Sequence, residues 1–170
     1  MPTPAYLSIK GKSQGNITSG TFTSDSVGNI YQEGHEDEIL VQAFHHDVTV
    51  PTDPQSGQPT GQRVHRPLVI TKVFDKCSPL LYRALCTGEL LTECVMKFYR
   101  TSAEGSQQHY FTITLNDAII TSIKPHMPNC QDPSQAHFTH LEDVSFSYLK
   151  ITWTHVVGST EHMDSWRSRT

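Results

Sequence analysis

The chain has 170 residues, a formal net charge of −4 at pH 7 and 13 basic residues scattered along it. This length suits one domain with its own core, and the lack of a basic stretch argues against nucleic acid as a partner. No apolar run approaches the roughly 20 residues of a membrane span, so we expect no membrane insertion. The first residues lack the basic and apolar regions of a signal peptide, which predicts a cytoplasmic protein that does not use the general secretory route.

The first third of the chain predicts strands joined by polar turns. Segments rich in β-branched and aromatic residues indicate strands at residues 5–10, 17–23, 27–32 and 39–50. The connection over residues 51–62 reads PTDPQSGQPTGQ. A loop of this length inside a compact domain is usually functional or mobile, so it is either a functional segment or a flexible surface loop.

The middle of the chain predicts the one helix. A β-branched run predicts a strand over residues 68–74. Ser78 is expected to cap a helix over residues 79–87, in which Pro79 suits the first position and Gly88 can take the left-handed conformation that ends it. Apolar side chains recur in this helix at spacings of three and four, so we expect it to pack on a sheet.

The rest of the chain returns to strands. Period-two alternation predicts them over residues 90–101, 109–115, 118–125 and 140–156. Asn116 and Asp117 predict a break between the middle two, and a switch of apolar parity near Tyr148 predicts a bulge or sharp bend. The order favours a mainly β domain, a barrel or a sandwich, over residues 1–158, with a polar C-terminal tail over residues 159–170.

Ten histidines make a metal site a possibility to test, and the densest cluster is His45-His46-Asp47. Alternate residues of a strand share a face, so His45 and Asp47 could supply two ligands, or a base with its orienting carboxylate. A third ligand would have to come from a distant strand. No metalloprotease, serine-hydrolase or phosphate-loop motif occurs in the sequence. We therefore expect a protein that is not an enzyme and needs no cofactor or metal, with a metal-dependent hydrolase using His45 and Asp47 as the alternative.

Five segments in order carry a resemblance to a known family. They read AYLSIKG (5–11), HEDEILVQAFHH (35–46), HRPLVITKVFDKCSPLLYRAL (65–85), EDVSFSYLKITWTH (142–155) and DSWR (164–167). On these segments the chain resembles the haemolysin-coregulated proteins (Hcp), which form the tube of bacterial type VI secretion. A phage tail-tube subunit, which shares the architecture and the assembly logic, is a further alternative.

The resemblance implies a fold, an assembly and a set of partners. The fold is mainly β, with two antiparallel sheets that form a β-barrel and one short α-helix at its side. The assembly is a homohexameric ring that stacks into a secreted tube, leaves without a signal peptide and carries small effector proteins in its lumen. The remaining partners are the sheath, spike and baseplate components of type VI secretion.

The resemblance also implies where contacts are made. The segment from Pro51 to Arg66 is similar to the family's extended loop, which reaches neighbouring protomers or rings, so we expect neighbours to order it. The expected interface residues are Pro51, Asp53, Pro54, Gln58, Thr60, Gln62, Arg63 and His65. The segment over residues 35–46 is similar to the family's lumen-lining strand, which makes His45 the expected contact to cargo.

Overall fold

The computed structural model describes residues 3–28 and 33–166. Its strands are β1 (Ala5–Gly11), β2 (Gly15–Asn16), β3 (Ile39–Val41), β4 (Ala43–His45), β5 (Val48–Thr49), β6 (Val64–His65), β7 (Leu68–Val73), β8 (Leu91–Thr101), β9 (Gln107–His126), β10 (Leu141–Ser147), β11 (Lys150–His155) and β12 (Thr160–Ser165). Its helices are the single-turn α1 (Ser24–Val27), the longer α2 (Ser78–Thr87) and a 3₁₀ turn at Pro133–Gln135. The prediction of a mainly β, antiparallel fold with a short helix is confirmed. None of the described helices is long and apolar enough to cross a bilayer.

Helix α2 begins and ends where local chemistry allows. Gly88 takes the left-handed conformation (φ 67°, ψ 31°) and its N–H bonds back to the last turn, as predicted. The predicted capping role of Ser78 was wrong, because Ser78 is the first helical residue and caps nothing. The carboxylate of Asp75 instead accepts a hydrogen bond from the N–H of Cys77 at 3.1 Å. An acceptor three residues upstream of the helix thus does the work expected of the serine.

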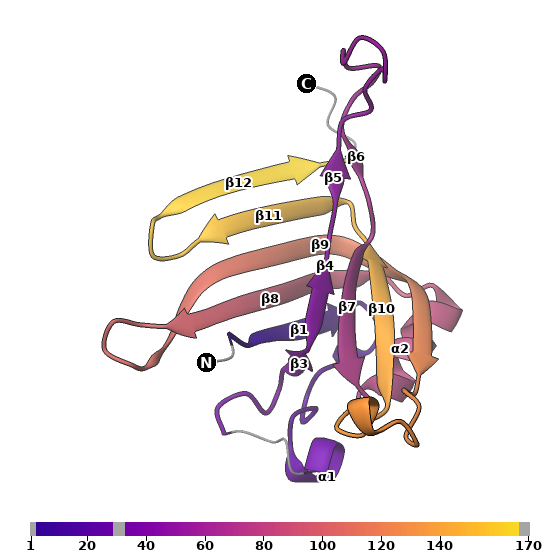
Figure 1. Ribbon diagram of the computed structural model, residues 1–170, viewed down its shortest axis with the longest axis vertical. Coiled ribbons are helices and arrows are strands. Elements are labelled where there is room, and N and C mark those ends of the chain that lie inside the picture. Colours follow the sequence, from indigo (N-terminus) through magenta and orange to yellow (C-terminus); the bar gives the residue numbers. More distant parts are fainter. Residues whose placement is uncertain (1–2, 29–32, 167–170) are drawn as a thin grey trace.

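The strands run in two main directions (Figure 1). β1, β8, β11 and β12 lie across the view, whereas β4, β7 and β10 stand upright beside α2. β9 belongs to both groups, because its first half pairs with β8 and β11 and its second half pairs with β10. This one long strand therefore turns the sheet from one direction into the other.

Several strand boundaries differ from the predictions. β9 is continuous where two strands were predicted, and Asp117 accommodates the expected break within it at a positive φ of 52°. The segment over residues 17–23 forms turns rather than a strand, although Ile17 and Phe22 are buried. The strand predicted over residues 27–32 lies largely outside the described residues, and Val27 ends α1.

Three further predictions concern the bend near Tyr148, the strand over residues 39–50 and the C-terminus. The predicted bend near Tyr148 is confirmed, because β10 ends at Ser147 and β11 starts at Lys150 with a different set of partners. The segment predicted over residues 39–50 is divided among β3, β4 and β5. Part of the stretch set apart as a polar tail forms β12, which pairs with β11 along its whole length.

A closed barrel is not formed by the strand pairs between described residues. Pairing instead gives one 10-stranded sheet and a separate two-stranded ribbon of β5 and β6. The segment Ile39–His45 links the far ends of the large sheet, because β3 pairs with β1 and β4 pairs with β7. Between them the N–H of Gln42 donates to the carbonyl of Thr71 at 2.8 Å. The sheet is therefore curled, and one short segment spans its two ends.

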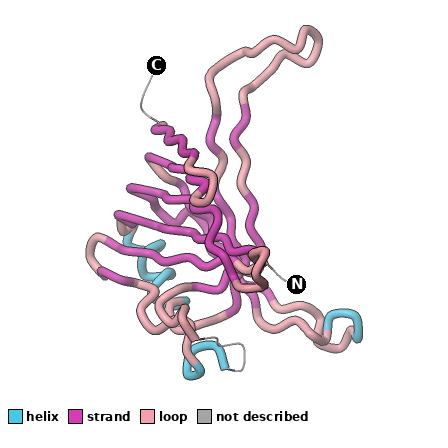
Figure 2. The backbone as a smooth tube through the Cα atoms, turned by 90° about the vertical axis from the view of Figure 1, so that its left-hand side faces the viewer, coloured by secondary structure: helices cyan, strands magenta, loops and turns pink. Residues whose placement is uncertain are grey.

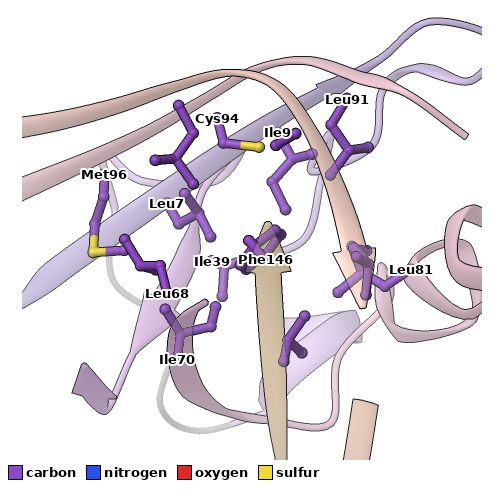
Figure 3. Packing of buried hydrophobic residues seen from close by; sticks show 14 of the residues in the cluster. Leu7, Ile9, Ile39, Leu68, Ile70, Leu81, Leu91, Cys94, Met96 and Phe146 are labelled. Atoms are coloured by element: carbon purple, nitrogen blue, oxygen red, sulfur yellow. The ribbon is translucent and has the colours of Figure 1, made fainter. Parts of the chain in front are cut away.

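The core lies inside this curl (Figure 3). Side chains from both strand directions and from α2 point into it. They include Leu7, Ile9, Ile39, Leu68, Ile70, Leu81, Leu91, Cys94, Met96 and Phe146, each at most 2% exposed. Full burial of one such aliphatic or aromatic side chain stabilises a fold by roughly 1.5–3 kcal/mol. The core thus fixes the two strand directions and α2 relative to one another.

A buried ion cluster joins α2 to the sheet. Lys72 and Glu142 are direct cross-strand partners on β7 and β10, and both are almost completely inaccessible. The ammonium of Lys72 contacts the carboxylate of Glu142, lies 3.1 Å from that of Asp75, and donates to the Ser78 hydroxyl at 3.0 Å. Burial opposes a charge on Lys72, but its neighbours, the two carboxylates among them, raise its pKa above the ordinary lysine value. The lysine is therefore a cation at the helix start.

Candidate interaction arm

The most prominent feature outside the curled sheet is a hairpin, residues 48–65, which we call the arm. Figures 1 and 2 show it projecting from the body with its two limbs side by side. At its base β5 pairs with β6, Val48 opposite His65 and Thr49 opposite Val64. Further out a single bridge joins Thr52 to Pro59. The arm is thus a hairpin in its own right, and it occupies the long polar loop singled out in the sequence.

The tip of the arm is organised by Asp53. Its backbone N–H donates to the carbonyl of Gln58 and its own carbonyl accepts from the N–H of Gly57, both at 2.8 Å. Its side chain accepts from the N–H of Gln55 at 2.9 Å, and this hydrogen bond lowers the pKa of the carboxyl. Gly57 supplies the positive φ of 71° that the turn requires. The tip therefore has a defined shape although its side chains face solvent.

The outgoing limb of the arm, residues 59–65, is the one through which the chain returns to the body. It is tied to the C-terminal strand β12. Arg63 makes a forked contact with the carboxylate of Asp164 on β12, at 2.8 and 2.9 Å, and also donates to the carbonyl of Ser165 at 2.8 Å. His65 adds a second tie, because its Nε2 lies 2.6 Å from the same carboxylate. Alternate residues of one limb thus converge on one acid.

A tyrosine joins the two limbs at the arm's base. The Tyr148 hydroxyl, at the bend between β10 and β11, lies 2.7 Å from Nδ1 of His65. The same hydroxyl lies 2.8 Å from Nε2 of His46. His46 precedes the incoming limb, residues 48–53, through which the chain enters the arm. His46 also faces the ring of Trp153, and His65 faces that of Trp166. The base of the arm is therefore a row of side chains, His46, Tyr148, His65, Asp164 and Arg63, here called the base row.

The base row has a defined charge pattern. The hydrogen bond from Arg63, aided by His65, lowers the pKa of Asp164 to about 2, so this carboxyl is ionised near neutral pH. Burial, with the charge of Asp164, raises the pKa of Tyr148 above that of an ordinary tyrosine, which keeps its hydroxyl protonated. Burial and the nearby His65 lower the pKa of His46 below its usual value. The base row therefore contains one carboxylate, Asp164, against Arg63 and His65, and Tyr148 takes part in it as a neutral hydroxyl.

The structure divides the predicted arm residues into two groups. Those of the outer arm lie at its surface, with Asp53 half-buried. The surface residues are Pro51, Pro54, Gln58, Thr60 and Gln62. Arg63 and His65 instead face their own chain, and His65 is only 6% exposed. The expectation that neighbours order the arm stays a prediction, to which the structure adds the arm's own hydrogen bonds.

His45 ends β4 with its side chain exposed, and Asp47 is exposed two residues further on. Among residues 3–28 and 33–166, no three histidine, cysteine or acidic side chains gather as a metal site would need. His45 and Asp47 thus lack the third ligand that the hydrolase alternative required. The lumen contact expected of His45 stays a prediction.

Sequence reasoning missed three members of the base row, His46 as a partner, Tyr148 and Asp164. Tyr148 and Asp164 lie 83 to 101 positions from the arm residues that they contact, and Tyr148 lies 102 positions from His46. Arg63 and His65 are two positions apart and so face the same side of the limb, but no local pattern names the acid opposite them. The contacts depend on β12, which the sequence analysis set apart as a tail.

Comparisons with known proteins agree over nearly the whole chain. A family profile described as "Type VI secretion system effector, Hcp" matches residues 6–155. The "Major exported protein" of Pseudomonas aeruginosa is 66% identical over 168 residues, covering 99% of this chain and 98% of that protein. A solved "Hcp protein" superposes with a TM-score of 0.94 at 48% identity, covering 99% of this chain and 100% of the other. The solved "Secreted protein Hcp3 from Pseudomonas aeruginosa" gives 0.84 at 56% identity, with 98% and 100% covered.

Proposed function

The chain belongs to the Hcp family of type VI secretion tube proteins, and from this premise we propose that six copies close into a ring whose stacks form the secreted tube. The observation that carries the proposal is the superposition on a solved Hcp protein over 99% of the chain. We further propose that the curled sheet closes into the barrel expected of this family, with the segment Ile39–His45 spanning its two ends.

The outer arm is the proposed contact between copies. It projects from the body, its tip keeps a fixed hairpin shape, and Val48 and Val50 expose 39% and 48% of their surface near its base. A ring requires that one face of a protomer meets a different face of the next, and a projecting hairpin can supply one of the two. The contact residues are proposed to be Pro51, Asp53, Pro54, Gln58, Thr60 and Gln62. Arg63 and His65 support this contact from inside the chain by holding the arm's base.

Transport follows from the same proposal. Export of the chain is supported by its likeness to a protein named for being exported, and the route is proposed to be type VI firing from the cytoplasm without a signal peptide. Sheath, spike and baseplate components are the proposed partners before firing. Small effectors are proposed to travel in the lumen, where the exposed His45 can contact them. The chain is proposed to have no catalytic activity.

The assembly is tested by size-exclusion chromatography with light scattering, backed by negative-stain images. We expect annular particles with the mass of six chains, and a monomer at every concentration would contradict the ring. A variant whose tip, residues 53–58, is replaced by Asn-Gly keeps a two-residue hairpin turn but loses the outer contact surface. It should fold with an unchanged circular dichroism spectrum and form fewer rings or stacks; ring formation equal to that of the unaltered chain would remove the arm from the contact.

Cargo binding needs a separate experiment. Effector that co-purifies with the unaltered chain is compared with effector retained by His45→Ala, with ring formation as the control. Reduced retention by intact rings is expected, and unchanged retention would show that His45 does not contact cargo.

A further inference from the structure

Each hydrogen bond of the base row needs one donor and one acceptor, so the protons of the row can be counted. With Asp164 ionised, the Nε2–H of His65 donates to it, which leaves Nδ1 of a neutral His65 as an acceptor. The Tyr148 hydroxyl then donates its single proton to that nitrogen, and its oxygen accepts from the Nε2–H of His46. Every donor between His46 and Asp164 has an acceptor, and both histidines are neutral.

One added proton is accommodated without losing a contact. If His65 takes it, Nδ1 becomes a donor to the tyrosine oxygen, and the tyrosine proton turns toward Nε2 of His46. The second histidine then needs only to carry its own proton on Nδ1. A cation at His65 lies beside the carboxylate of Asp164, which it shares with Arg63.

A second added proton cannot be accommodated. Both histidines would then direct N–H groups at one hydroxyl oxygen, the tyrosine proton would have no acceptor in the row, and two cations would face each other across a single hydroxyl. The lowered pKa of His46, caused by burial and by His65, agrees with this count. The second proton therefore breaks the contact between His46 and Tyr148.

The charges around the two histidines do not remove the conflict. His65 faces Tyr148, Asp164 of β12 and the Trp166 ring, and the acid is already shared with Arg63. His46 faces Tyr148, Trp153 of β11, the charge of His65 and its neighbour Asp47, which is exposed. The one carboxylate of the row, Asp164, thus lies against His65 and not against His46, so a charge on His46 would have only the exposed Asp47 near it.

We propose that His46, Tyr148 and His65 form a proton-controlled latch at the base of the arm. Beside the backbone pairs of β4 with β7 and of β5 with β6, side chains hold the arm at two points near neutral pH, His46 on the incoming side and the pair of Arg63 and His65 on the outgoing side. In acid the incoming side is released, whereas Arg63 keeps the outgoing side on Asp164. The arm then changes its angle and mobility while its hairpin stays intact. The latch belongs to a single chain and does not rest on the proposed assembly.

The latch is tested by the distance between two spin labels within one chain. One label is placed at the tip by Gln55→Cys and one on β8 by Thr92→Cys, with the exposed Cys86 and Cys130 replaced by serine. Labelled chains are diluted into unlabelled ones, so that the distance is measured within a chain whether or not rings form. Between about pH 8 and about pH 5 the distance distribution should broaden, with a midpoint below the usual histidine value of 6.5.

Two variants separate a latch from a merely structural contact. His46→Gln keeps an N–H that donates to Tyr148 but cannot gain a proton, so the narrow distribution should persist in acid. Tyr148→Phe removes the shared hydroxyl, so the broad distribution should appear at both pH values. The proposal is overturned by an unchanged distribution in the unaltered chain, or by a His46→Gln or Tyr148→Phe variant that responds to pH as the unaltered chain does.

Discussion

Removing the cation of the buried ion cluster should destabilise the protein much more than removing one of its anions. The cluster holds the ammonium of Lys72 against the carboxylates of Glu142 and Asp75. Lys72→Met leaves two buried carboxylates without a cation, and breaking a buried pair in this way costs about 3–5 kcal/mol. Glu142→Gln leaves the ammonium with Asp75, with the Ser78 hydroxyl at 3.0 Å and with the Val73 carbonyl at 3.0 Å. The ion pair with Glu142 becomes a hydrogen bond to a neutral amide while Asp75 still balances the ammonium, which costs about 1.5–3 kcal/mol.

The two variants should also differ in their response to pH. In Lys72→Met the remaining carboxylates repel each other, so one of them holds a proton more tightly when folded than when unfolded. Folding then takes up a proton, and the penalty is largest near neutral pH and shrinks as the pH falls toward about 4. Glu142→Gln keeps one cation and one anion and should show no such recovery.

Urea unfolding at one fixed protein concentration gives these free energies, since the stability of an assembling protein depends on concentration. The measurement is made near pH 7 and near pH 5 for both variants and the unaltered chain. Equal losses for the two variants, or a loss for Lys72→Met that does not shrink in acid, would refute the assignment of a net negative cluster balanced by one lysine.

Three further predictions concern other parts of the chain. Gly88→Ala should lower the free energy of unfolding by about 1 kcal/mol because the φ of Gly88 is 67°. The control Gly61→Ala, with open space around it, should change this free energy by less than about 0.5 kcal/mol. Equal effects of the two substitutions in urea unfolding would contradict the left-handed cap. Asp164→Asn should flatten the dependence of stability on acid pH. The carboxyl of Asp164, whose pKa is lowered to about 2, stabilises the fold above pH 3.8 and loses that effect as the pH falls through 2. If the thermal midpoint of the variant falls with pH as steeply as that of the unaltered chain, the Arg63 contact is contradicted. Ile70→Ala, at a position with no exposed surface, should cost about 2–5 kcal/mol in the same urea assay, and a loss below about 1 kcal/mol would place Ile70 outside the core.

Elements defined by neighbouring residues were predictable from the sequence. α2 was found because Pro79 and Gly88 act within a turn of their own position, and the bend at Tyr148 was found because strand parity is local. The stretch over residues 17–23 was wrongly predicted as a strand, since burial of Ile17 and Phe22 resembles strand burial without the pairing. The residue types of a segment indicate that its side chains are buried, but a strand also needs a neighbouring strand to pair with.

The candidate site was predictable only as a segment. The length and composition of the loop indicated the arm, but its hairpin is closed by the turn around Asp53 and its base by an acid on another strand. Contacts between residues about a hundred positions apart leave no mark in one sequence. His65 and Arg63 were therefore expected at the surface of the arm, whereas the structure uses them to hold it.

The position of β1 sets the order in which this protein can fold. β1 lies between β3 and β8, and its Ala5 pairs with Phe98, which the ribosome adds more than half a chain later. β3 can pair with one edge of β1, where Leu7 lies opposite Ile39, but the other edge of β1 has no partner until β8 has emerged. Pairing between such distant segments is slow and leaves strand edges open while it is incomplete. Newly made chains must therefore wait, with one edge of their first strand unpaired, until translation is well past the midpoint.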